Sequence, residues 1–166
     1  MVTLSAQDVW KWLEDVKDPE VPVLSVVELG IVRDVRIADG AVTVVITPTY
    51  SGCPAMHEIE QEIVRALGAR GVDSVGLETV YAPAWTTDWM SEAAKQKLAA
   101  YGIAPPGHIT SGPDIIPLQR RAVTAVPCPY CGSHETELRS FYGSTACKAI
   151  QFCRACKQPF EEFKAI

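Results

Sequence analysis

The sequence predicts a small α/β sandwich of the α+β kind, with helices over a small sheet, followed by a separate four-cysteine metal ribbon. Over residues 1–102, apolar positions alternate at strand spacing and then recur at helical spacing, which indicates one packed α/β domain. Two Cys-x-x-Cys pairs then occur within residues 128–166. A stretch rich in Pro and Gly, residues 103–127, lies between these regions and is typical of a partly extended linker.

Length, charge and cysteine usage limit the possible function classes. The chain has 166 residues, 48% of them hydrophobic, which suffices for one ordinary domain and a small appendage. The net charge is −5, and there is neither a long basic run nor an apolar stretch of membrane-spanning length, so we expect no nucleic-acid binding and no membrane span. The N-terminal residues lack a signal-peptide pattern, so we expect a cytoplasmic protein. Six cysteines in a reducing compartment favour metal binding or catalysis over disulfides.

The first region begins with a helix and a hairpin. Ser5-Ala6-Gln7-Asp8 resembles a capping box and predicts the start of a helix. Asp18 and Glu20 follow in a loop interrupted by prolines, where they serve either as a solvated turn or as groups near the candidate site. Asp39-Gly40 is a strong two-residue turn signal, and the alternating segments on either side of it predict a β-hairpin.

The stretch Thr47–Met56 joins the second hairpin strand to an amphipathic helix and contains one cysteine, Cys53. Proline is favoured at the first position of a helix, so Pro54 predicts that Cys53 lies at or next to the N-cap. There it would face unpaired backbone N–H groups and the positive end of the helix dipole. Such a position stabilises a thiolate, which makes Cys53 the candidate reactive residue.

The remaining elements of this region follow from periodicity. A helix after Cys53 carries apolar residues at helical spacing: Met56, Ile59, Ile63 and Leu67. Alternation predicts a third strand through Val75, Leu77, Thr79 and Tyr81. A last helix has an apolar stripe of Met90, Ala94 and Leu98 and ends near Gly102.

The two Cys-x-x-Cys pairs have the spacing of a metal site. Cys128 and Cys131 are separated from Cys153 and Cys156 by twenty-one residues, close to the usual spacing of a four-cysteine zinc site. Four thiolates form a closed tetrahedral site, which is a structural arrangement, and a metal would supply folding energy that about forty residues cannot obtain from burial. Zinc is the expected ion; iron or an iron–sulfur cluster is the alternative. Gly132 would permit the tight turn after Cys131.

A fifth cysteine of this module, Cys147, lies between the pairs. It is either a buried neighbouring thiol or an exchangeable or cluster ligand. Lys and Arg nearly balance Glu in the module, which favours contact with a protein over contact with nucleic acid.

Several motifs carry a resemblance to a known family. The small α/β domain of iron–sulfur cluster assembly factors is similar to residues 5–102, on the motifs Asp18-Pro19-Glu20, Leu29-Gly30-Ile31-Val32, Asp39-Gly40 and Thr47 ahead of Cys53-Pro54. Nearly the whole chain resembles the D-subunit family of the bacterial phenylacetyl-CoA ring epoxidase system. The further motifs are Trp85-Thr86-Thr87-Asp88-Trp89, Tyr101-Gly102-Ile103-Ala104-Pro105-Pro106, Val126-Pro127-Cys128-Pro129 and Gly143-Ser144-Thr145-Ala146-Cys147-Lys148.

The resemblance implies an accessory protein of phenylacetate catabolism without independent catalytic activity. Its partners would be a di-iron oxygenase and a flavin, iron–sulfur reductase, and its task would be to assemble or maintain a metal centre. By position, Cys53 matches the reactive or cluster-handling cysteine of the family, Cys147 matches a recurrent extra cysteine, and the two Cys-x-x-Cys pairs match the ribbon ligands. One thiolate cannot close a cluster site, so a homodimer, Cys147 or a client protein would supply the other ligands.

Two alternatives remain open from the sequence. The chain could be a scaffold that docks components of the epoxidase through its ribbon without transferring metal. It could also be an enzyme with Cys53 as nucleophile, because His57 follows one helical turn later.

Overall fold

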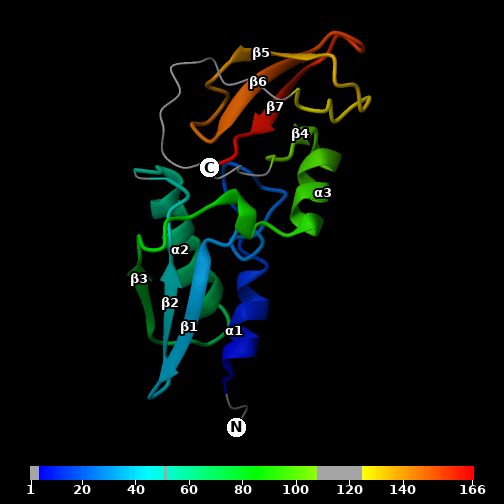
Figure 1. The fold of residues 1–166 in the computed structure, drawn as a ribbon. Coiled ribbons are helices and arrows are strands. Elements are labelled where there is room, and N and C mark those ends of the chain that lie inside the picture. The colour runs from blue at the N-terminus through cyan, green and yellow to red at the C-terminus, as the bar shows by residue number, and fades with distance from the viewer. Residues whose placement is uncertain (1–3, 51, 108–124) are drawn as a thin grey trace. The chain divides into compact units, whose positions relative to one another are not determined.

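The chain folds as two units, Met1–Ala94 and Lys95–Ile166. The computed structural model describes residues 4–50, 52–107 and 125–166 (Figure 1). The division falls within helix α3 (Glu92–Tyr101), and each unit has its own sheet. None of the helices in the described ranges is long and apolar enough to cross a membrane.

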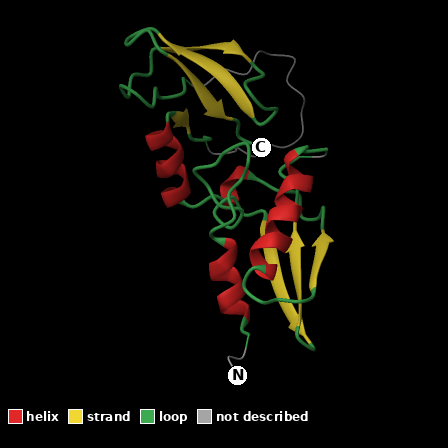
Figure 2. Cartoon of the chain, turned by 180° about the vertical axis from the view of Figure 1, so that it is seen from behind, coloured by secondary structure: helices red, strands yellow, loops and turns green. Residues whose placement is uncertain are grey.

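The first unit is a three-stranded sheet with two helices packed on one face (Figures 1 and 2). The strand order is β1-β2-β3, with β1 antiparallel and β3 parallel to β2. Helix α1 packs against α2 and β1, and α2 also contacts β3. The elements are α1 (Ala6–Leu13), β1 (Val32–Ala38), β2 (Ala41–Ile46), α2 (Ala55–Gly68), β3 (Val75–Thr79) and the short helix η1 (Thr87–Trp89).

Two local signals read from the sequence are confirmed. Ser5 and Asp8 form a reciprocal capping box: the Asp8 N–H donates to Ser5 Oγ at 3.2 Å, and the Ser5 N–H donates to Asp8 Oδ2 at 3.3 Å. The hairpin turn places Asp39 at φ 50° and Gly40 at φ 80°, the positive pair that a type I′ turn requires. These contacts determine where α1 begins and which residues of β1 and β2 face each other.

Strand β2 lies at the centre of the sheet, and helix α2 returns the chain across it. A parallel β2–β3 pair needs a crossover connection, so α2 runs antiparallel to both strands and begins at their carboxyl ends. The helix buries one stripe, with Ala55 in place of the predicted Met56, which is only half-buried. The buried residues of these two elements are Val42, Val44, Val45, Ile46, Ala55, Ile59, Ile63 and Leu67.

The second unit contains a four-stranded sheet in the order β4-β7-β6-β5. Strands β5, β6 and β7 form an antiparallel meander, and β4 pairs in parallel with β7. Ile103 and Ala104 form β4, although the sequence predicted that they belong to the linker. The strand was not predicted because two residues are too few to show a strand period. The strands are β4 (Ile103–Ala104), β5 (Thr136–Ser140), β6 (Lys148–Cys153) and β7 (Pro159–Phe163). Residues 108–124 of the predicted linker lie outside the described residues.

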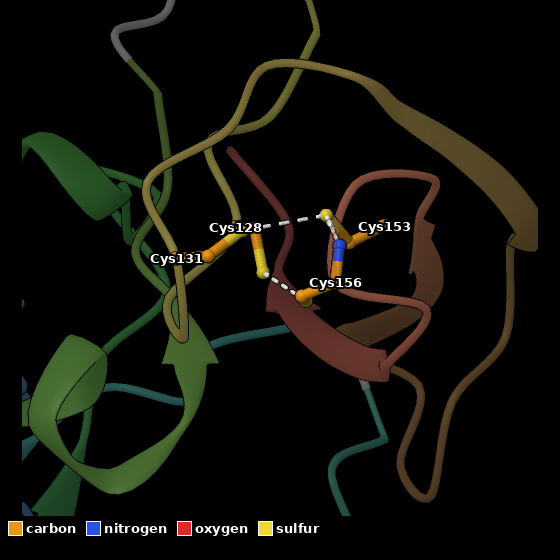
Figure 3. A group of neighbouring side chains, drawn as sticks. All are labelled: Cys128, Cys131, Cys153 and Cys156. Carbon is orange, nitrogen blue, oxygen red and sulfur yellow. Dashed lines mark hydrogen bonds between the residues drawn. The ribbon is translucent and has the colours of Figure 1, made fainter.

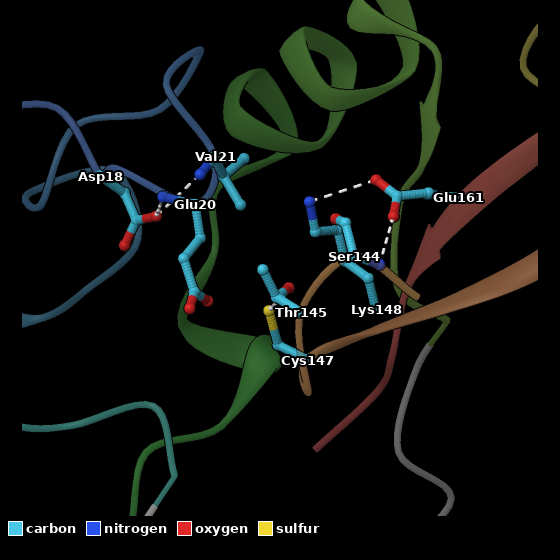
Figure 4. Close-up of polar contacts among 8 residues, drawn as sticks. All are labelled: Asp18, Glu20, Val21, Ser144, Thr145, Cys147, Lys148 and Glu161. Carbon is cyan, nitrogen blue, oxygen red and sulfur yellow. Dashed lines mark hydrogen bonds and ion pairs between the residues drawn. The ribbon is translucent and has the colours of Figure 1, made fainter. Parts of the chain in front are cut away.

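An ion pair links β6 to β7 in this sheet (Figure 4). The Lys148 ammonium, which is buried, lies 3.1 Å from Glu161 Oε2, and the Ser144 N–H donates to Glu161 Oε1 at 2.8 Å. Burial opposes ionisation of Glu161, but the Ser144 N–H and the Lys148 ammonium outweigh it and hold the pKa of Glu161 below its usual value. The charged form of Glu161 is therefore the form that the fold stabilises.

Truncation of the buried stripe of α2 tests the packing of the first unit. We expect Ile63→Ala to lower the free energy of unfolding by about 2–5 kcal/mol, because Ile63 is fully buried and its loss leaves a cavity. Glu58→Ala, on the exposed face of the same helix, should change it by less than about 0.5 kcal/mol. Urea unfolding followed by far-UV circular dichroism measures both, and equal effects would contradict the packing described.

The second test follows the pH dependence of Glu161. A carboxyl whose folded-state pKa is lowered contributes stability above its unfolded pKa and loses that contribution as the pH falls through the folded value. We expect Glu161→Gln to lower unfolding stability by about 1 kcal/mol at neutral pH, with a gap to wild type that narrows in acid. Glu135→Gln, at an exposed position, should show no such gap. A gap that widens in acid would contradict the assignment.

Candidate functional site

Cys53 lies in the turn between β2 and α2, at the carboxyl ends of the parallel strands. Pro54 is the N-cap residue of α2, and Cys53 precedes it. Of the two predicted positions, at the N-cap or next to it, the structure places Cys53 next to the N-cap. The Cys53 N–H donates to the Tyr50 carbonyl at 3.3 Å, and the Cys53 carbonyl accepts from Met56 N–H at 3.3 Å. These backbone bonds orient the residue at the start of the helix. Ser51 lies outside the described residues.

The surroundings of Cys53 leave its sulfur available. The residue is half-buried, and Pro54, the N-cap residue of α2, provides no side-chain cap. Within the described ranges, no side-chain hydrogen bond or disulfide involves the Cys53 sulfur. A partly exposed thiol beside uncapped backbone N–H groups can bind a metal or an electrophile without first breaking another contact.

Thr47, at the end of β2, is a polar residue that sequence reasoning did not single out by its own chemistry. Its backbone N–H donates to the Ile31 carbonyl at 2.9 Å, and its side chain is 1% exposed. Thr47 Oγ1 has no hydrogen-bond partner among the described residues. A buried hydroxyl without a partner is costly, which makes Thr47 notable at the start of the Cys53 turn. Only the fold reveals this, because burial of a single hydroxyl leaves no mark in a sequence.

The side chain of His57 contacts Gln61 and not Cys53. Its Nε2 lies 2.9 Å from Gln61 Nε2, one helical turn further along α2. In the part of the chain that the structure describes, no hydrogen bond joins His57 to Cys53. The structure therefore does not assemble the Cys–His pair that a nucleophilic mechanism would use.

Asp18, the first carboxylate of the predicted acidic loop, has a structural role. Asp18 is buried, and its Oδ1 accepts hydrogen bonds from the N–H groups of Glu20 and Val21, both at 2.8 Å (Figure 4). This arrangement holds the turn that follows α1. Asp18 Oδ1 is therefore engaged by backbone donors.

The four cysteines of the two Cys-x-x-Cys pairs converge on one point (Figure 3). Their sulfur atoms all lie within 4.8 Å of one another; Cys128 and Cys156 are 3.7 Å apart, and Cys131 and Cys153 are 3.6 Å apart. A tetrahedral ion with metal–sulfur bonds of about 2.3 Å separates its sulfur ligands by about 3.8 Å. The donor set and its spacing therefore fit a four-thiolate metal site.

Two equivalent turns present these cysteines. The Gly132 N–H donates to the Cys128 carbonyl at 2.8 Å, and the Lys157 N–H donates to the Cys153 carbonyl at 3.0 Å. Both donors have positive φ, 71° for Gly132 and 64° for Lys157. The sequence predicted the turn only at Gly132. Lys157 holds the equivalent position after the second cysteine pair, which could have indicated a second turn, but lysine seldom adopts a positive φ.

Strands β4 and β7 pack apolar side chains against the cluster. Ala104 and Phe160 form a buried group with Cys128 and Cys153. The Cys156 N–H donates to Cys153 Sγ and lowers the pKa of Cys153 to about 7, whereas burial raises the pKa of Cys156 to about 12. The backbone donor therefore favours the thiolate form of Cys153, and a bound cation would favour it at all four cysteines.

Cys147 does not belong to this cluster of four. It is buried, its sulfur lies 3.0 Å from Thr145 Oγ1, and its carbonyl accepts from the Lys164 N–H at 2.9 Å. Cys53 and Cys147 belong to different units. Their joint role as cofactor ligands therefore stays a prediction.

Two family models match the chain and together cover both units. The model of an iron–sulfur cluster assembly protein matches residues 6–84, and the PaaD zinc β-ribbon domain matches residues 114–164. The match to a zinc β-ribbon covers the four converging cysteines, and the predicted fold class is confirmed.

Individual relatives agree with these models. The chain is 40% identical over 159 residues to the proposed D-subunit of the 1,2-phenylacetyl-CoA epoxidase of Escherichia coli, covering 96% of this chain and 92% of that protein. It is 37% identical over 94 residues to an Fe-S protein maturation auxiliary factor of Porphyromonas gingivalis, covering 55% of this chain and 89% of that protein.

The fold of the first unit also has solved neighbours. A domain of unknown function from Bacillus anthracis superposes with a TM-score of 0.53 at 29% sequence identity, covering 56% of this chain and 90% of that one. The relative from Escherichia coli extends over both units and both cysteine pairs. The chain therefore belongs to the D-subunit family of phenylacetyl-CoA epoxidases, in which an iron–sulfur assembly domain is joined to a zinc ribbon.

Proposed function

We propose that this chain is an accessory protein that delivers iron or an iron–sulfur cluster to the phenylacetyl-CoA epoxidase system, through Cys53. The observation that carries the proposal is the partly exposed Cys53 thiol at an uncapped helix start, within a domain that matches iron–sulfur assembly proteins. Thiolates are the usual ligands of such cargo. Delivery is then a ligand exchange, in which a metal–Cys53 bond forms as a donor bond breaks, and later breaks as a client thiolate binds.

The clients that fit this role are the iron-containing proteins of the same system. The relative of Escherichia coli is named as part of an epoxidase, and relatives of the first unit are named Fe-S protein maturation factors. Because this chain resembles both kinds of protein, an oxygenase or reductase of phenylacetate degradation is supported as the recipient of the iron or cluster.

For the ribbon we propose a resident zinc ion held by Cys128, Cys131, Cys153 and Cys156. Four thiolates leave no open position for a substrate, so the ion would hold the two turns together and supply folding energy to the second unit. The match to a zinc β-ribbon supports zinc over iron.

A second candidate function is docking without metal transfer. The aromatic rings of Phe141 and Tyr142, 60% and 69% exposed, meet edge to face at 5.6 Å between centroids, and Lys164 Nζ lies 4.3 Å from the Phe141 ring centroid. Exposed aromatic groups beside a cation are typical of protein interfaces. Such a surface would bind a component of the epoxidase independently of Cys53.

Substitution of Cys53 separates these functions. We expect Cys53→Ser to leave folding and ribbon metal intact while the iron and sulfide content of the co-produced reductase and oxygenase falls to the level of cells lacking this chain. His57→Ala, a matched change one turn away, should leave client iron unchanged, because no nucleophilic pair operates. Elemental analysis of the purified clients measures the result; full client iron with Cys53→Ser would favour docking alone.

Removal of one ribbon cysteine tests the resident ion. We expect Cys156→Ser to reduce bound zinc well below one ion per chain and to destabilise the second unit, because three thiolates no longer close the site. Cys147→Ser, a buried cysteine outside the cluster of four, should retain the ion. Elemental analysis with an absorption spectrum of anaerobically purified protein measures both. Brown protein containing iron and sulfide would contradict zinc.

A further inference from the structure

The outer edge of strand β3 is open in the first unit (Figure 1). The Val42 N–H donates to the Ser74 carbonyl at 2.9 Å, and the Val80 N–H donates to the Ile46 carbonyl at 2.8 Å. Since backbone groups alternate along a strand, the even-numbered residues of β3 face β2. The N–H and C=O groups of its odd-numbered residues, 75, 77 and 79, therefore point outward, and within the described ranges β3 pairs with β2 alone.

This edge lacks three features that commonly prevent strand addition. Strand β3 contains no proline, no lysine and no register shift in its pairing with β2. The opposite edge, β1, has a register shift between Val32 and Asp34 and is lined with charged residues. The β3 edge is thus the unprotected end of the sheet.

A groove of about 380 Å³ lies beside this edge, between α2 and β3. Val64, which is 43% exposed, and Leu77 form its apolar part, and Glu60 and Arg65 place opposite charges along it. The lining residues are His57, Glu60, Gln61, Val64, Arg65 and Leu77. A partner that adds a strand to β3 would also cover this groove.

The edge is complementary to a second copy of itself. If two β3 strands pair antiparallel with Leu77 opposite the partner's Leu77, the outward groups of Val75 meet those of the partner's Thr79. Gly76 then lies opposite the partner's Glu78, so the two carboxylates do not oppose each other. A two-fold axis normal to the sheet keeps both α2 helices on one face, where Leu77 and Val64 meet their counterparts in the second copy.

The charges of α2 follow the same symmetry. The axis reverses the helix direction, so the Glu60 end of one groove meets the end that carries Arg65 of the partner subunit. In the described part of the chain Glu60 has no ion-pair partner, whereas Arg65 pairs with Glu62 of its own helix. We propose that a second copy of this chain docks on the β3 edge, giving a two-fold dimer with one continuous sheet.

This dimer keeps the two Cys53 thiols apart. Helix α2 has 14 residues and is about 21 Å long, and Cys53 lies at the carboxyl end of β3. Antiparallel pairing puts that end of one copy beside the amino end of the other, so the thiols lie at opposite ends of the interface. Each copy would then hold its cargo through its own Cys53, with further ligands from a donor or client. This consequence rests on the proposed role of Cys53, but the proposed interface is independent of that role.

The mass of the full zinc-loaded chain in solution tests the interface. We expect wild type to sediment as a dimer and Thr79→Pro to sediment as a monomer, because proline removes an outward N–H that the sheet itself does not use. Glu78→Gln, on the other face of the strand, should remain dimeric. Far-UV circular dichroism and zinc content of both variants should equal those of wild type. A monomeric wild type, or a dimeric Thr79→Pro, overturns the proposal.

A charge exchange keeps the test decisive if Thr79→Pro fails to fold. We expect Glu60→Lys and Arg65→Glu each to weaken association by roughly tenfold, and the double variant to recover it, because the opposite pairs are restored across the axis. No recovery would overturn the proposed pairing. Covalent linkage of two Cys53 thiols by a short bifunctional maleimide, or protection of β3 amides only on addition of a different protein, would also overturn it. Loss of client delivery by Cys53→Ser with the dimer intact would show that the two proposals stand separately.

Discussion

The second unit depends on the convergence of four cysteine sulfurs. Among its described residues, its sheet has three strands of five or six residues, and few large apolar side chains are buried, so burial alone gives little stabilisation. Two turns with the same hydrogen-bond pattern bring both cysteine pairs to one point, where Ala104 and Phe160 pack against them. An ion at that point would form metal–thiolate bonds to all four sulfurs, which is how small ribbons commonly acquire stability.

The first unit differs from the second because its core is built from apolar side chains. The parallel pairing of β2 and β3 requires a crossover, and the crossover helix must start where β2 ends. Cys53 lies in that connection, next to a helix start whose N-cap residue, Pro54, provides no side-chain cap. A strongly packed sheet and helix thus hold a thiol at a position where backbone donors and partial solvent access coexist.

The two cysteine sites therefore have opposite chemical characters within one chain. Four converging thiols make a closed site suited to permanent binding, whereas a single thiol makes an open site suited to exchange. The charge is also unequal: the first unit carries 6 Lys and Arg against 15 Asp and Glu, and the second carries 9 against 5. The proposed exchange site thus belongs to an acidic unit and the four-cysteine site to a basic one, so the two units would attract partners of different charge.

The sequence by itself determined helices α1 and α2, the three strands of the first unit, the turn at Asp39-Gly40 and the cysteine pairs, because hydrophobic period, turn chemistry and ligand spacing are local properties. It did not reveal that Ile103-Ala104 completes the ribbon sheet, since a two-residue strand has no period and is defined only by its partner, β7. Nor did it show that the Thr47 hydroxyl is buried without a hydrogen-bond partner among the described residues. Both features depend on which groups are brought into contact by elements that are distant in the sequence, and only the tertiary structure decides that.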